Sequence, residues 1–81
     1  METTKYFAFQ DTAAGFIQWV GAGKDEIEVA TAFKNDVKFE QTPEEMLEDL
    51  EVTELTLEQY KKLEDVAGDD QDAIDYLESI K

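Results

Sequence analysis

Two short segments near the start of the chain restrict its fold more than any other feature. In residues 5–10 (KYFAFQ) the side chains alternate, so a strand would place Phe7 and Phe9 on one face. Residues 11–15 (DTAAG) then supply a turn, because their glycine can adopt a positive φ. Residues 16–20 (FIQWV) form the return strand, which the following Gly-Ala-Gly ends. This pattern predicts an antiparallel hairpin.

Residues 25–39 fit two kinds of structure. A helix would begin at Asp25, with Glu28 three positions later at capping-box spacing. One face of that helix would carry Val29, Ala30, Phe33 and Val37. The strand alternative rests on the alternation of Ile27, Val29, Thr31 and Phe33, whose branched members suit a sheet. We favour a helix that ends near Asn35, followed by a short extended stretch over residues 37–39.

Capping signals organise the second half of the chain. Thr42-Pro43-Glu44-Glu45 has capping-box spacing, with proline at the first helical position. Thr56-Leu57-Glu58-Gln59 repeats the box, and Asp69 or Asp70 would cap a last helix. Between the two boxes, residues 52–55 predict a short strand. Gly68 would end the middle helix.

Each of these helices has an apolar face. The first would turn Met46, Leu47 and Leu50 inward. The second would use Tyr60, Leu63, Val66 and Ala67, and the last Ala73, Ile74, Leu77 and Ile80. With 42% apolar and 11% aromatic residues, the 81-residue chain can bury one small core. We therefore predict a single α+β domain over residues 1–81. A small antiparallel sheet, made of the N-terminal hairpin plus one or two short strands, would pack against about three helices.

The chain lacks the groups on which most catalytic and metal sites depend. It contains no histidine, no cysteine and a single serine, Ser79, so histidine-assisted nucleophilic catalysis and thiolate metal sites are excluded. Residues 21–24 (GAGK) have neither the length nor the register of a P-loop. Counting an EF-hand loop from Asp70 places Asp75 at the glycine position and Lys81 at the glutamate position. We expect no enzyme activity, no cofactor and no metal site. Without a signal-like or membrane-spanning segment, we expect a cytoplasmic protein.

Negative charge is concentrated in the second half of the chain. The net charge is −14, with −3 over residues 1–40 and −11 over residues 41–81, and all seven bases are lysines. Glu44 and Glu45 would favour a helix N-terminus, but Glu48 and Asp49 would lie towards the C-terminus, where negative charge is unfavourable. In the last helix, Asp72, Asp75 and Glu78 recur every three residues and would repel one another. Folding alone does not explain these acids.

Two uses of the acidic residues follow. They could merely keep the protein soluble, or they could imitate the phosphates of a nucleic acid and fill a basic cleft. In size, acidity and lack of catalytic groups, the chain resembles small phage proteins that disarm bacterial defences, such as anti-CRISPR and anti-restriction proteins. This resemblance of overall profile implies an inhibitor and assigns no residue a role.

We therefore predict a protein that binds a basic, nucleic-acid-binding surface of a protein partner, and neither nucleic acid nor membrane. Carboxylates from separate segments would converge into one patch. The candidate residues are Glu44, Glu45, Glu48, Asp49, Glu51, Glu54, Asp69, Asp70, Asp72 and Asp75. The alternative is an adaptor that docks through the hairpin edge or exposed aromatics such as Trp19. In that case the acidic residues would only keep the protein soluble. A domain without any partner is the third possibility.

Overall fold

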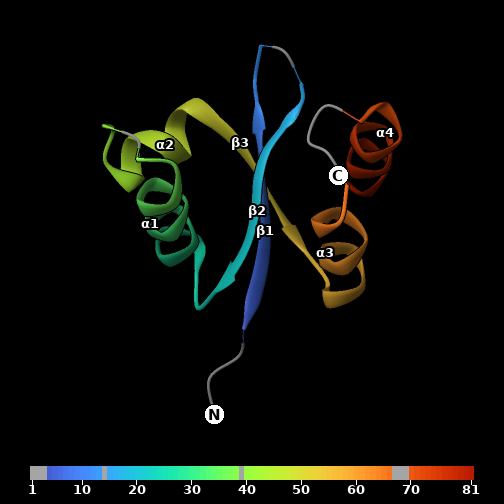
Figure 1. The fold of residues 1–81 in the computed structure, drawn as a ribbon, viewed down its shortest axis with the longest axis horizontal. Helices are drawn as coiled ribbons and strands as arrows, with labels where there is room; N and C mark the ends of the chain where they lie inside the picture. Colours follow the sequence, from blue (N-terminus) through green and yellow to red (C-terminus); the bar gives the residue numbers. More distant parts are fainter. Residues whose placement is uncertain (1–3, 14, 39, 67–69) are drawn as a thin grey trace.

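A three-stranded sheet stands between two pairs of helices in the computed structural model of this chain, which describes residues 4–13, 15–38, 40–66 and 70–81 (Figure 1). The elements follow the order β1 (Lys5–Asp11), β2 (Ile17–Gly23), α1 (Glu26–Val37), α2 (Pro43–Asp49), β3 (Leu50–Leu55), α3 (Leu57–Glu64) and α4 (Gln71–Ile80). The predicted α+β class, with the hairpin and one further strand, is confirmed. No helix among the described residues is long and apolar enough to cross a membrane.

β1 is the central strand of the sheet, with β2 on one side and β3 on the other. Both pairings are antiparallel. Gly15 adopts a φ of 82° in the hairpin turn, as its position predicted. The return strand does not end at Val20, because Gly21 pairs with Phe7 and the ladder continues to Gly23. The expected end at the Gly-Ala-Gly stretch is therefore wrong.

The alternation in β1 gives the molecule two cores, one on each face of the sheet. Phe7 and Phe9 pack with α1 and α2, contacting Val29, Phe33 and Met46 among others. Ala8 lies on the opposite face, in a cluster with residues of α3 and α4 such as Leu63 and Leu77. In Figure 1 the two helical pairs accordingly lie on opposite sides of the sheet. We call these the α1/α2 layer and the α3/α4 layer.

Trp19 belongs to the first of these cores. Its indole stacks on Phe33, with ring centroids 5.1 Å apart and an interplanar angle of 1°. It also lies over Gly21, where an added Cβ would come within 2.6 Å of the indole Cη2. The aromatic residue that the adaptor hypothesis offered to a partner is thus half-buried and held by packing inside its own chain.

The ambiguous segment after the hairpin is a helix. Asp25 caps α1 by accepting a hydrogen bond of 2.9 Å from the backbone N–H of Glu28, as the spacing predicted. The helix continues past Asn35 and ends at Val37. The extended conformation expected for Val37 is therefore wrong. Lys38 ends it in the left-handed conformation, with a φ of 59°. The remaining residue of that stretch, Phe39, lies outside the described residues.

Both predicted capping boxes are present. In each, the threonine side chain accepts from the backbone of the third helical residue, whose side chain accepts in turn from the threonine N–H. Some boundaries differ from the prediction. Leu50 begins β3 and does not belong to the preceding helix, so the strand starts two residues earlier than expected. α3 ends at Glu64, which leaves Val66 beyond the helix and exposed. Ala67 and Gly68 lie outside the described residues.

Candidate protein-binding surface

The ten candidate residues do not converge on one patch. Glu44, Glu45, Glu48 and Asp49 belong to α2, which packs on one face of the sheet through Met46. Asp70, Asp72 and Asp75 cap or belong to α4, which packs on the opposite face through Ala73 and Leu77. The expectation of a single patch is therefore wrong for these two groups, since the sheet lies between them. Asp69 lies outside the described residues.

The two candidates in β3 also diverge, because neighbouring positions of a strand alternate between its faces. Glu54 pairs with Phe7 and so lies on the face of the α1/α2 layer. Glu51 pairs with Gln10 and lies on the face of the α3/α4 layer. β3 thus carries one acid on each face of the sheet.

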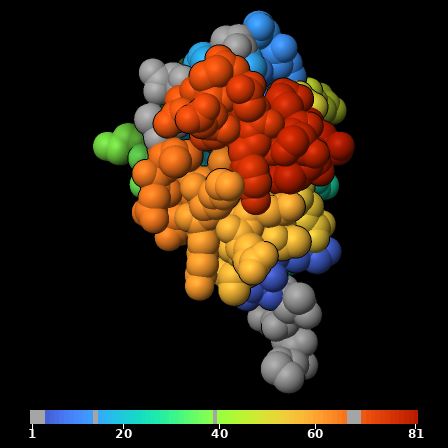
Figure 2. All heavy atoms as spheres, turned by 90° about the vertical axis from the view of Figure 1, so that its right-hand side faces the viewer, coloured from blue at the N-terminus to red at the C-terminus, as the bar shows by residue number. Residues whose placement is uncertain are grey.

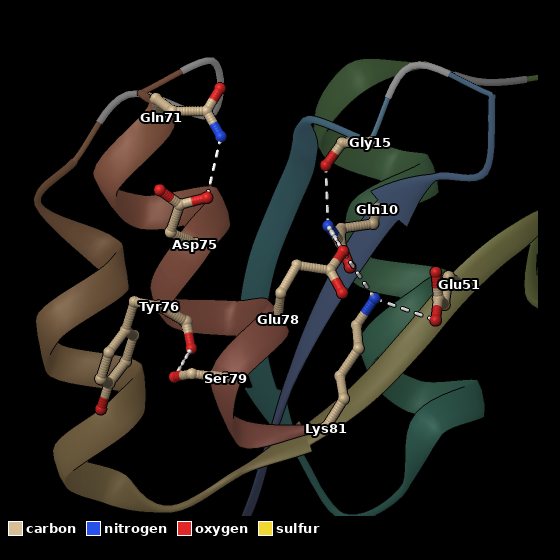
Figure 3. Close-up of polar contacts among 9 residues, drawn as sticks. All are labelled: Gln10, Gly15, Glu51, Gln71, Asp75, Tyr76, Glu78, Ser79 and Lys81. Carbon is tan, nitrogen blue, oxygen red and sulfur yellow. Dashed lines mark hydrogen bonds and ion pairs between the residues drawn. The ribbon is translucent and has the colours of Figure 1, made fainter.

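On the α3/α4 side, Glu51 belongs to a polar cluster with the end of α4 (Figure 3). The Lys81 Nζ lies 2.9 Å from Glu51 Oε1 and 3.3 Å from Glu78 Oε1. Partial burial lowers the pKa of Lys81, but the hydrogen bonds to the two carboxylates outweigh this and leave its pKa raised. Glu78 also accepts from the amide of Gln10, at 3.4 Å.

Sequence reasoning missed Glu78 as a site residue. The three-residue repeat of acids in α4 was a signal for it, because the repeat placed it beside Asp75 on the helix. Gln10 gave no such signal. It is only 1% exposed, its Nε2 donates to the Gly15 carbonyl at 2.7 Å, and its Oε1 has no hydrogen-bond partner among the described residues.

Several candidate acids have local structural roles. Glu45 completes the α2 capping box, and Asp49 accepts a hydrogen bond from Gln41. Asp70 caps α4 through the N–H of Asp72, and Asp75 accepts from Gln71 at 2.9 Å. These hydrogen bonds hold the carboxylates in place without neutralising them.

Three other candidates, Glu44, Glu48 and Glu54, make no ion pair within the described part of the chain. All three are exposed. A charged partner could therefore reach these carboxylates without displacing an internal cation.

One stretch keeps its acidic character across element boundaries. Residues 40–58 contain eight acids and no lysine. This stretch, which we call the acidic segment, includes α2, β3 and the start of α3. Its acids are all exposed: Glu40, Glu44, Glu45, Glu48, Asp49, Glu51, Glu54 and Glu58. In Figure 2 the yellow atoms, which belong to the later part of this segment, lie uncovered beneath α4. The acidic segment is the part of the predicted site that is continuous along the chain, and its acids lie on both faces of the sheet.

The described residues form small hollows and no metal-binding group of acids. No three of their acidic side chains are grouped so that they could hold a metal ion. A hollow of about 80 Å³ lies between α3 and α4, and another of about 110 Å³ lies between β2 and α3. Both are well below the roughly 300 Å³ at which pockets begin to enclose a small ligand. No family model, curated protein or solved structure matches this chain.

Proposed function

We propose that this protein binds a basic, nucleic-acid-binding surface of a protein partner through the acidic segment, and that it inhibits the partner by taking the place of nucleic acid. The observation that carries the proposal is the run of eight exposed acids without a lysine over residues 40–58. The proposed site is thereby narrowed from the ten predicted residues to the six in α2 and β3. It also gains Glu40 and Glu58.

The placement of these acids supports a use beyond solubility. Glu48 and Asp49 occupy the last turn of α2, where no base balances the negative end of the helix dipole. Acids that only solubilise could occupy any exposed position, including the many that cost no stability. Most of the acidic segment belongs to α2, β3 and the start of α3, so its backbone is ordered before a partner arrives.

The physical basis of binding would be the release of counterions and electrostatic steering. A basic groove that binds nucleic acid attracts a surface of net negative charge at long range, which speeds association. Phosphates and carboxylates then compete for the same lysine and arginine side chains. Binding of this kind weakens as the salt concentration rises.

Capture experiments with matched charge variants test the proposal. The immobilised protein should retain basic nucleic-acid-binding proteins from a bacterial lysate, and added duplex DNA or a higher salt concentration should release them. The variant Glu44→Lys/Glu48→Lys/Glu54→Lys should lose this capture. A control with the same change in net charge, Glu26→Lys/Asp36→Lys/Asp65→Lys, lies outside the acidic segment and should keep most of it. Retained proteins that neither DNA nor salt displaces would count against the proposal.

The second candidate function is an adaptor that docks through the hairpin edge. It is favoured by one observation, that β2 has no neighbouring strand on its outer side among the described residues. The variant Ala22→Lys places a charge at an exposed position of this edge without touching the acidic segment. If this variant abolishes capture while the triple reversal in α2 and β3 does not, the adaptor is the better description.

A further inference from the structure

Among the described residues, the sheet has two free edges that differ in regularity. On β2, the register shifts between Phe9 and Gln10 of its partner strand, so the ladder is interrupted by a bulge. On β3, all six residues from Leu50 to Leu55 pair with β1 in unbroken register. Bulges blunt an edge strand, whereas a straight edge offers a template for another strand. By this criterion β3 is the edge better suited to pairing.

The outer side of β3 is accessible as well as straight. Four consecutive residues of the central strand β1 are buried, but in β3 only Leu55 is. The strand contains neither proline nor glycine, so each residue carries an N–H and a side chain. In an antiparallel pair, alternate residues turn their N–H and C=O groups away from the partner strand. Along β3 these outward groups have no second strand to bind among the described residues.

The charges on β3 select what could pair with it. β3 contains two glutamates and no lysine or arginine, so a second copy of the strand would bring no base to either carboxylate. A second copy therefore offers this edge no charge complementarity. The same two carboxylates would attract a strand that carries lysine or arginine at the facing positions.

An internal contact shows that a base is accommodated at one of these positions. Lys81 lies beside Glu51, at 2.9 Å, on the face of the α3/α4 layer (Figure 3). The Glu51 side chain nevertheless remains 50% exposed. On the other face Glu54 is exposed and forms no ion pair within the described residues.

We propose that the outer edge of β3 binds an extended, basic segment of a partner protein by strand addition. Because Glu51 and Glu54 are three positions apart and lie on opposite faces, the segment would carry two basic residues separated by two others. The intervening residues would face Val52 and Thr53, which favours β-branched side chains there. This inference rests on the proposed function for its site and adds the mode of recognition and the spacing of the basic residues.

Two short peptides of equal composition test the spacing. In acetyl-VKTVKT-amide the lysines are three apart, and in acetyl-VKTKVT-amide they are two apart and share one face of a strand. Titrated into ¹⁵N-labelled protein, the first should bind at least about threefold more tightly than the second, because only the first can meet both glutamates. The variant Glu54→Gln should remove this preference, whereas Glu26→Gln in α1 should keep it.

Hydrogen exchange reports on the backbone contact itself. With the first peptide bound, amides at alternate β3 positions should become protected from exchange, and those of β2 should not. Lys81→Met should tighten binding by removing the internal competitor for Glu51.

Equal affinity for both peptides, or shifts spread over the acidic surface without protection of β3 amides, would overturn strand addition. If capture of nucleic-acid-binding proteins and its reversal by DNA persist in that case, the proposed function stands and only the mode fails. If the peptide protects the β3 amides but DNA does not reverse the capture of proteins, strand addition stands and the proposed function fails.

Discussion

At the scale of single residues, the contact between Trp19 and Gly21 explains why the hairpin continues through a glycine-rich stretch. The indole occupies the space that a side chain at position 21 would need, and it is held there by stacking on Phe33. Glycine usually weakens a strand. Here it leaves room for the indole, which packs against the core of the α1/α2 layer. The sequence alone did not reveal this, because the contact between Trp19 and Gly21 depends on the orientation of the indole side chain.

Replacing Gly21 with alanine should therefore destabilise the protein by about 1–3 kcal/mol, the usual result of overpacking a core. The new Cβ would push the indole off Phe33. Since Trp19 is the single tryptophan of the chain, its fluorescence reports the displacement directly. Urea unfolding of Gly21→Ala, with the exposed neighbour Ala22→Ser as control, measures the effect. A variant as stable as the control, with an unchanged emission maximum, would contradict this account of Gly21.

Tyr60 gives the stability of the protein a dependence on alkaline pH. Burial raises the pKa of its hydroxyl above 10.0, and a hydrogen bond to the Glu64 carboxylate raises it further. A group whose folded pKa is raised contributes stability that is present below its unfolded pKa and is lost as the pH rises through the folded value. The free energy of unfolding should thus fall above pH 10, and less steeply in Tyr60→Phe. Parallel pH profiles of the variant and the wild type would exclude this role.

At the scale of secondary-structure elements, local signals predicted where helices begin better than where they end. The capping boxes at Thr42 and Thr56 involve only residues within one turn, so their spacing in the sequence was sufficient. The end of α2 depends on the pairing of Leu50 with Asp11, which is far away in the sequence. A non-local contact therefore decides a boundary that periodicity placed later. Periodicity also left the segment of α1 undecided between helix and strand, because its apolar residues fit both periods.

α2 also permits a test of whether its acids were placed for folding. Glu44 lies in the first turn, where the helix dipole favours a carboxylate, and Glu48 lies in the last, where it does not. Glu44→Gln should lower the free energy of unfolding by about 0.3–1 kcal/mol, and Glu48→Gln should raise it by a similar amount. Thermal or urea unfolding at low salt measures both. If Glu48→Gln also destabilises, Glu48 contributes to folding, and the argument that it serves binding loses its support.

At the scale of the whole molecule, the sequence indicated how much charge there is but not how the sheet divides it. The alternation in β1 predicted two faces, yet nothing local specified which face each helix would cover. The α2 and α4 acids were therefore expected together and lie in separate layers. What the sequence did show was continuity along the chain: residues 40–58 hold eight acids and no lysine. The acidic segment therefore remains a candidate site, although β3 places Glu51 and Glu54 on opposite faces of the sheet.

The net charge of −14 gives a last prediction, in which salt acts oppositely on folding and on binding. Repulsion among the acids opposes the compact state, and its range shrinks as the Debye length falls from about 10 Å at 0.1 M salt to about 3 Å at 1 M. Sodium chloride should therefore raise the unfolding temperature over this range while it releases the captured partner. The triple variant Glu44→Lys/Glu48→Lys/Glu54→Lys, which reduces the magnitude of the negative net charge, should show a smaller rise. Loss of both stability and binding with salt would instead mean that the partner dissociates because the protein unfolds, and competition for basic side chains would not be needed to explain it.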